Sequence, residues 1–390
     1  MNFWDDKRLV LGLLAAICLG NFSIFSTPLY IGGLIDAYGF DETFAGLIST
    51  LEIGSTALVC LLLPNRVAKV ALRRACLMGA VVALFANLAT PWISSFSGLA
   101  IIRLVAGIGV GITLAVVSTI LARSSQPDRL IAIVLVINTM IMTLALVVMG
   151  YAKQAWLFNG FIYTFVGTMV LVVPLLWLLP KTIGDDDKAL QSRVDSGGDR
   201  KFFLGVIGVA LVFVFCLIEG SVLAFSERSG LRVGLTGSEI GLLLAGSQIS
   251  GLVGASIPAV FGDRLSPQPV ILICLLLVSL AGVAVYHADL VPVYVVAMLV
   301  FSFGFFAAIP YLIGICARLD SNGVWAARGA GGNLLGGGAA PFVAGTVVGA
   351  AGHESLGLIV LLFGLASMVC TIFFFRASTE KKTTSLPVSN

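Results

Sequence analysis

The sequence predicts an all-α integral membrane protein with twelve membrane-spanning helices in two pseudo-symmetric bundles of six. Three observations support this fold class. First, 58% of the 390 residues are hydrophobic and only 11% are charged, whereas about 25% of the residues in soluble domains are charged. Second, long apolar runs recur along the whole chain. Third, the longest polar stretch falls near the middle of the chain.

Each predicted span is an apolar run long enough to cross the hydrocarbon core of a bilayer, which takes about 20 residues at 1.5 Å per residue. The first run follows Lys7 and Arg8 as a signal peptide would, but it continues to Ile35 without a small-x-small cleavage site, so we expect a retained span. The runs cover residues 9–35, 43–64, 72–93, 96–122, 130–152, 157–180, 202–226, 237–261, 269–287, 290–317, 325–350 and 355–375.

The most polar stretch, KTIGDDDKALQSRVDSGGDRK, predicts a cytoplasmic linker between two halves of six helices each. Its acidic run Asp185–Asp187 is typical of a solvated linker, and a regulatory patch is the alternative. The predicted organisation is an N-terminal bundle at 1–180, a linker at 181–201, a C-terminal bundle at 202–376 and a cytoplasmic tail at 377–390.

The two halves resemble each other at a constant offset. Sliding the chain by 195 residues places Gly109 on Gly304 and Asn138 on Asn333 without gaps. A repeat at constant offset is the sequence signature of a duplicated structural unit.

The positions of the cations predict the orientation. Of the 23 Lys and Arg residues, 19 fall at the termini or in loops on the same side as the termini. Lys153, Arg228 and Arg232 fall on the opposite side, and Arg103 lies inside a span. Because cytoplasmic loops are enriched in Lys and Arg, we expect a multi-pass plasma (inner) membrane protein with both termini in the cytoplasm.

Several function classes are disfavoured by what the sequence lacks. The seven cysteines all lie in apolar runs without a C-x-x-C pair, and the chain has only two histidines, so we expect no metal site and no cofactor. Neither G-x-S-x-G nor H-E-x-x-H occurs, which disfavours an enzyme. A net charge of +3 without a basic tract argues against nucleic-acid binding.

The fourth run contains IIRLVAGIGVGI, in which Arg103 precedes Gly107, Gly109 and Gly111. Two six-helix halves in parallel repeat are one architecture of secondary transporters, with the substrate site between the halves. In this architecture and in the R-x-x-x-G-x-G pattern, the chain resembles the major facilitator superfamily from Leu9 to Arg376. The resemblance implies transport by alternating access, with the arginine taking part in proton or substrate coupling, and we expect a monomer.

The family's cytoplasmic latch, G-x-x-x-D-R-x-G-R-R between helices 2 and 3, is only partly present. The stretch PNRVAKVALRRAC has Ala68 at the position of the acid but keeps Arg73 and Arg74. The second-half copy, AVFGDRLSPQP, retains Asp263 and Arg264. If the family role transfers, we expect gating by these arginines and, above all, by Asp263.

Three charged residues lie deep inside predicted spans: Glu52, Arg103 and Glu219. Ionisable groups in a membrane are costly and are functional by default. Burial favours the protonated form of a carboxylate, whereas a nearby arginine favours the ionised form, so an acid exposed to both in turn can carry a proton. Arg103 and Glu219 have similar predicted depth, and we expect them to pair; a structural pair with either acid is the alternative.

We therefore expect a proton-coupled transporter of a small organic anion or amphiphilic metabolite, which docks on Arg103. The alternative is multidrug or metabolite efflux by proton antiport, which the fifth run, IMTLALVVMG, disfavours because it lacks the antiporter glycine-proline motif. For Asn138 and Asn333 among the further candidates, helix packing is the favoured role, and a hydrogen bond to a polar substrate is the alternative. The further candidates for substrate contact are Asn21, Phe25, Asn138, Gln248, Tyr311 and Asn333.

The glycine-rich segment GAGGNLLGGGAAP at 329–341 invites comparison with a phosphate-binding loop. It follows no predicted strand and lacks the lysine and hydroxyl residue of such a loop. Because it falls inside the eleventh span, its backbone must be helical. We expect its small residues to let helices pack closely at the interface between the halves.

Overall fold

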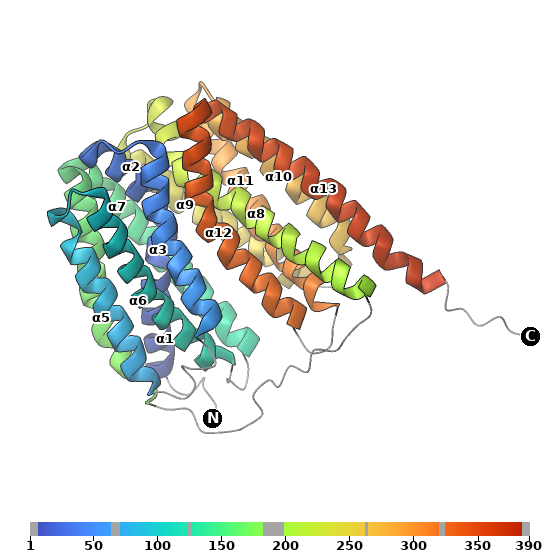
Figure 1. Ribbon diagram of the computed structural model, residues 1–390, viewed down its shortest axis with the longest axis horizontal. Helices are drawn as coiled ribbons and strands as arrows, with labels where there is room; N and C mark the ends of the chain where they lie inside the picture. The colour runs from blue at the N-terminus through green and yellow to red at the C-terminus, as the bar shows by residue number, and fades with distance from the viewer. Residues whose placement is uncertain are drawn as a thin grey trace, which may run out of the picture.

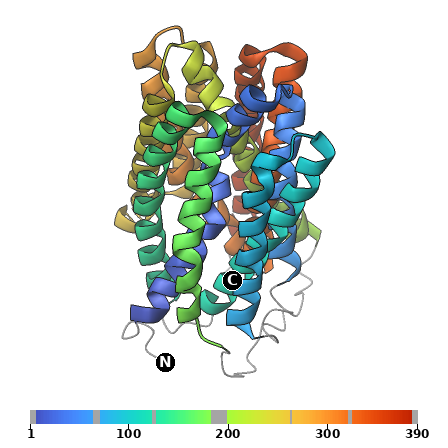
Figure 2. The same ribbon diagram turned by 90° about the vertical axis from the view of Figure 1, so that its left-hand side faces the viewer.

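The computed structural model describes residues 7–63, 71–122, 127–181, 199–261, 264–319 and 324–383. These residues form long helices that run roughly along one common axis (Figures 1 and 2). The helices are α1 (Lys7–Phe25), α2 (Thr27–Tyr38), α3 (Glu42–Leu62), α5 (Leu72–Ala89), η1 (Thr90–Trp92), α6 (Phe96–Ala122), α7 (Pro127–Val172), η2 (Val173–Leu178), α8 (Asp199–Arg232), α9 (Gly237–Phe261), α10 (Pro267–His287), α11 (Val291–Ala317), α12 (Val324–Ala351) and α13 (His353–Thr383).

The predicted spans are confirmed. Within the described residues, eleven helical segments are long and apolar enough to cross a membrane. One of them, Ile133–Leu178, contains both the fifth and the sixth predicted spans. Its helix α7 is broken at Trp156 and Leu157, where the backbone leaves helical geometry and Leu157 adopts a φ of 54°, so the chain reverses there. The described part of the chain thus traverses the bundle twelve times.

The first predicted span is one traverse with a kink. It consists of α1 and α2, which meet at Ser26. Pro28 lies in the first turn of α2 and has no backbone N–H to donate to the preceding turn. The hydroxyl of Ser26 donates to Phe22 O at 2.6 Å, and Thr27 donates to Ser23 O at 2.8 Å. Side-chain bonds to the preceding turn of this kind bend helices.

The bundle has two ends, the Lys7 end and the Asp36 end. The Lys7 end holds the start of α1, and the Asp36 end holds the end of α2. The N-terminal half comprises α1 to η2 and the C-terminal half comprises α8 to α13. Residues 182–198 of the predicted linker, including Asp185–Asp187, lie outside the described residues.

The two halves meet along three helix pairs: α3 with α12, α2 with α8, and α7 with α9. Figure 1 shows α3 in blue beside α12 in orange-red, with the halves diverging toward the Lys7 end. One of these pairs reflects the sequence repeat directly, because α2 and α8 belong to the first span of their respective halves.

The glycine-rich segment lies within α12 and packs against α3, as predicted. A Cβ on Gly345 would overlap the carbonyl of Glu42, and a Cβ on Gly46 would overlap the carbonyl of Pro341. Backbone therefore contacts backbone between the halves, which only residues without a side chain permit. Gly337, on the same helix, has no atom within 4 Å of a built Cβ.

Replacing Gly345 by Ala is expected to lower the thermal unfolding midpoint in detergent, because the added methyl group forces α3 and α12 apart at a cost of about 1–3 kcal/mol. Gly337→Ala is the matched control on the same helix, and it should be neutral or stabilising by up to about 1 kcal/mol. Equal midpoints for the two variants would contradict close packing at Gly345.

Candidate functional site

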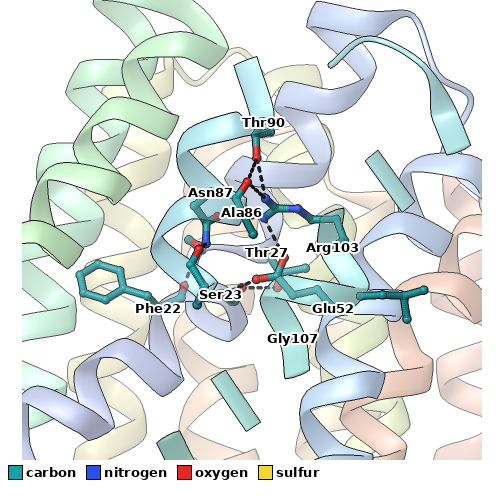
Figure 3. Close-up of polar contacts among 12 residues, drawn as sticks. Phe22, Ser23, Thr27, Glu52, Ala86, Asn87, Thr90, Arg103 and Gly107 are labelled. Atoms are coloured by element: carbon teal, nitrogen blue, oxygen red, sulfur yellow. Dashed lines mark hydrogen bonds and ion pairs between the residues drawn. The ribbon is translucent and has the colours of Figure 1, made fainter. Parts of the chain in front are cut away.

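Arg103 lies on α6, about two turns from its start at Phe96, and is only 1% exposed. Figure 3 shows its guanidinium directed at neighbouring helices of the same half. Nη1 donates to Glu52 Oε2 at 3.1 Å and to Asn87 Oδ1 at 2.9 Å. Nη2 donates to Thr90 Oγ1 at 2.5 Å and to Ala86 O at 3.3 Å. The buried charge is thus paired and hydrogen-bonded, as a low-dielectric interior requires.

The glycines after Arg103 explain how it reaches Glu52. A Cβ on Gly107 would overlap Glu52 O and Ser55 Oγ on α3. Because glycine leaves this space free, the two helices come close enough for Thr56 Oγ1 on α3 to donate to Gly107 O at 3.0 Å. Helices α3 and α6 therefore approach closely one turn after Arg103, which brings the guanidinium and the carboxylate together.

Glu52 is 4% exposed and uses both oxygens. Oε2 pairs with Arg103, and Oε1 accepts a hydrogen bond from Ser23 Oγ on α1 at 2.5 Å. Tyr30 on α2 presents its ring to the guanidinium, with 5.5 Å between Arg103 Cζ and the ring centroid, a cation–π distance. The Arg103 network thus joins α6 to five other elements of the N-terminal half: α1, α2, α3, α5 and η1.

A small cavity adjoins this network. It has about 10 Å³ of free space, roughly that needed by one water molecule. The hydroxyls of Tyr30 and Ser49 line it and are buried without a partner among the described residues. The cavity is therefore polar and bordered by unused hydrogen-bonding groups. Its lining residues include Ser23, Ser26, Thr27, Tyr30, Ser49, Glu52, Asn87, Arg103, Phe161 and Phe165.

The predicted pair between Arg103 and Glu219 was wrong. Arg103 pairs with Glu52 in its own half, whereas Glu219 lies on α8 and borders a separate cavity in the C-terminal half. Similar depth along the membrane normal did not bring the two side chains together, because they belong to different bundles. Within the described residues, Glu219 forms neither an ion pair nor a hydrogen bond.

The Glu219 cavity also has about 10 Å³ of free space. Polar groups from Ser247, Gln248 and Ser302 line it together with rings from α11. The Ser247 hydroxyl is buried and has no partner among the described residues. Gln248, a predicted substrate residue, is thereby placed beside Glu219. The apolar lining comprises Val222, Leu223, Leu244, Met298, Phe301, Phe305 and Phe306.

The two cavities occupy equivalent places in the repeat. At an offset of 195 residues, Glu52 corresponds to Ser247 and Arg103 corresponds to Met298, and all four line one cavity or the other. The C-terminal half therefore has no counterpart of the arginine or of its acid. Instead its cavity is lined by a single acid, Glu219, from the helix equivalent to the first span.

The other predicted substrate residues line neither of these two cavities. Asn333 accepts from Cys216 Sγ at 3.1 Å within its own half. Asn138 is 1% exposed, and its Oδ1 has no partner in the described part of the chain. Tyr311 is buried, and its hydroxyl is likewise unpartnered there. Asn21 and Phe25 are half-buried on α1.

The predicted gating residues form no ion pair among the residues that the structure describes. Arg73 Nε donates to Leu179 O at 2.6 Å, a contact inside the N-terminal half. Arg74 and Arg264 are exposed. Asp263 lies outside the described residues. No group of three or more His, Cys, Asp and Glu in this part of the chain is placed to hold a metal ion.

A charged cluster at the Asp36 end was missed by the sequence analysis. Lys153 Nζ on α7 pairs with Glu227 Oε1 on α8. Arg228 Nη2 on α8 pairs with Asp36 Oδ1 on α2 at 2.8 Å. Each of the four residues lies near the end of its helical run, where a charge is expected to be solvated. One signal in the sequence could have indicated these pairs. In each pair an acid and a base belong to opposite halves and lie at a similar distance from the same end of the bundle.

A double-mutant cycle on Arg103 and Glu52 tests the central pair. Glu52→Gln or Arg103→Met alone leaves a buried charge without its partner, which costs about 3–5 kcal/mol and should lower the thermal unfolding midpoint. The double variant, which copies the Met298 position of the other half, should lose about 1–3 kcal/mol less than the sum of the single losses. Strictly additive losses would rule out the pair.

The family model described as Major Facilitator Superfamily matches residues 11–323. No curated protein matches the chain. The fold is similar to that of the nucleoside transporter NupG, with a TM-score of 0.70 and 16% identity over 95% of this chain and 99% of that one.

Two further solved structures share the fold. A D-xylose-proton symporter has a TM-score of 0.71 and 16% identity, covering 96% of this chain and 97% of that one. A bacterial homolog of the human lysosomal transporter Spinster, in an inward-facing and unoccupied conformation, has a TM-score of 0.71 and 15% identity, covering 95% and 97%. With twelve traverses, two bundles and the matching family model, the chain belongs to the Major Facilitator Superfamily of secondary transporters.

Proposed function

We propose that the chain is a proton-coupled symporter of a small organic anion, with Glu52 and Arg103 as the coupled pair. The observation that carries the proposal is the buried contact between the two side chains beside a polar cavity. A D-xylose-proton symporter has the same fold, which supports proton coupling in this architecture and says nothing about the solute. The excess of cations at the Lys7 end supports placing that end in the cytoplasm of an inner-membrane protein.

The coupling would work through competition for Arg103. In the present arrangement the guanidinium donates to Glu52 and to three neutral oxygens. A proton taken up by Glu52 removes the negative charge that holds Arg103. The guanidinium is then free to bind the carboxylate of a solute, for which it has suitable geometry. Proton and anion thus favour each other's binding, which is the requirement for symport.

The size of the cavity adds a condition. Free space for about one water molecule does not admit an organic solute. Binding therefore requires the first span to move away from α3 and α6. The kink at Ser26, which borders the cavity, is a place where α2 can move relative to α1.

A second candidate, efflux of an organic cation by proton antiport, is favoured by one observation. Glu219 has no partner among the described residues and borders phenyl rings from α11. An unpaired carboxylate and aromatic rings together attract organic cations. In this scheme Glu219 exchanges a proton for the cation. Unlike the symport scheme, it makes no use of Arg103.

Thermal shift assays on the purified protein separate the two candidates. Probes are organic acids that stay ionised across the range, together with tetraphenylphosphonium as a cation, at pH 5.5 and pH 7.5. Symport predicts stabilisation by an acid, larger at pH 5.5, and a ligand at 100 times its Kd stabilises by about 2.7 kcal/mol. Stabilisation by the cation alone, lost in Glu219→Gln, would overturn the symport proposal in favour of antiport.

Transport assays in proteoliposomes then test the coupling residue. With the acid identified above, Glu52→Gln should reduce uptake driven by a pH gradient by about tenfold or more, while solute exchange without a gradient continues. Glu354→Gln, which changes an exposed acid at the start of α13, is the matched control and should behave like the unaltered protein. Gradient-driven uptake that persists in Glu52→Gln would clear Glu52 of the coupling role.

A further inference from the structure

Two ion pairs join the halves at the Asp36 end, and neither belongs to the Arg103 network. One connects α7 to α8 through Lys153 and Glu227. The other connects α2 to α8 through Asp36 and Arg228. Each ion pair therefore joins a residue of the N-terminal half to a residue of the C-terminal half. We propose that these four residues form a charge clamp, which holds the Asp36 end closed and must separate in each transport cycle.

Burial distinguishes the two pairs. The side chains of Lys153 and Glu227 are 9% and 2% exposed, whereas those of Arg228 and Asp36 are 17% and 50% exposed. Solvent-exposed pairs contribute little to stability, but breaking a buried pair by removing one partner is strongly destabilising. The Lys153–Glu227 pair is therefore the principal contact of the clamp, and the Arg228–Asp36 pair lies at its rim.

The clamp also binds the backbone of α2. Lys153 Nζ donates to Leu29 O at 3.0 Å, and Arg228 Nη2 donates to Gly32 O at 2.9 Å. A Cβ on Gly32 would overlap the Glu227 carboxylate, so glycine at this position is what lets α8 approach α2. Opening this end would break the Arg228–Gly32 contact along with the ion pairs, whereas the Lys153–Leu29 contact stays within the N-terminal half.

A pocket that adjoins the surface reaches the buried pair. A pocket of about 500 Å³ is lined by Asp36, Lys153 and Glu227, together with Trp156 and Leu157 at the break in α7. The two residues at the break are 70% and 76% exposed, so the pocket adjoins the surface. Oε2 of Glu227 has no hydrogen-bond partner among the described residues. When the halves separate, this pocket can supply the water that both charges then need.

The clamp deepens the proposed function, because an alternating-access transporter must close one end while the other is open. It assigns that task at the Asp36 end to residues different from Arg73, Arg74, Asp263 and Arg264, which were expected to gate the opposite end. The remaining contacts between α7 and α9 at this end are uncharged: Gln154 Oε1 accepts from Ser238 N at 3.0 Å.

Hydrogen–deuterium exchange on the full chain in lipid nanodiscs tests the clamp. Glu227→Gln and Lys153→Gln should each speed exchange of residues 29–38 and 227–236 by roughly tenfold, because each leaves a buried charge unpaired at the closed end. The charge-reversed double variant Lys153→Glu with Glu227→Lys should restore slow exchange. Glu239→Gln is the control at the same end, since the contacts of Glu239 stay within its own half at Thr236.

Unchanged exchange in both single variants overturns the clamp. If the reversed variant does not fold, Asp36→Asn decides, because it removes only the rim pair: faster exchange confined to these segments supports the clamp, and unchanged exchange counts against it. The measurement needs neither a solute nor a pH gradient. A failed clamp therefore leaves the transport proposal standing, and a failed transport assay leaves the clamp result intact.

Discussion

The guanidinium of Arg103 imposes the strictest constraint on this structure. A cation at this depth is costly in a bilayer unless it is paired and hydrogen-bonded, and Arg103 meets the requirement with oxygens from α3, α5 and η1. Those oxygens must all lie within hydrogen-bond distance of one guanidinium. The contacts therefore set how the helices that carry them are positioned along one another. The glycine at 107 lets α6 and α3 approach closely enough for this.

The duplication of the fold makes the two halves alike in shape but different in chemistry. Where the N-terminal half has Arg103 and Glu52, the C-terminal half has Met298 and Ser247. One cavity therefore contains a neutralised pair and the other a single acid, Glu219. This asymmetry suits the symport proposed above, in which the proton and the solute are bound by different groups.

The spans, the depth of Arg103 and the packing role of the glycines could be predicted, because hydropathy and helix rise give position along the membrane normal. The partner of Arg103 could not be predicted, because depth does not specify which side of a helix a residue faces. Lys153 and Glu227 were missed for a related reason. Hydropathy treats a charge near a helix end as solvated, whereas here two such ends meet and bury most of the pair.

The contacts between the halves differ in kind along the bundle. Between α3 and α12, glycines of α12 lie against α3 at both ends of the helix pair: Gly345 lies against Glu42, and Gly331 lies against Leu61. Such surfaces have few interlocking side chains, so a small rotation about them disturbs little. Ion pairs instead lose most of their attraction once the ends separate and water enters between the charges, because the effective dielectric constant rises. The few charges at the Asp36 end therefore discriminate between closed and open arrangements, while the glycine contacts can persist in both.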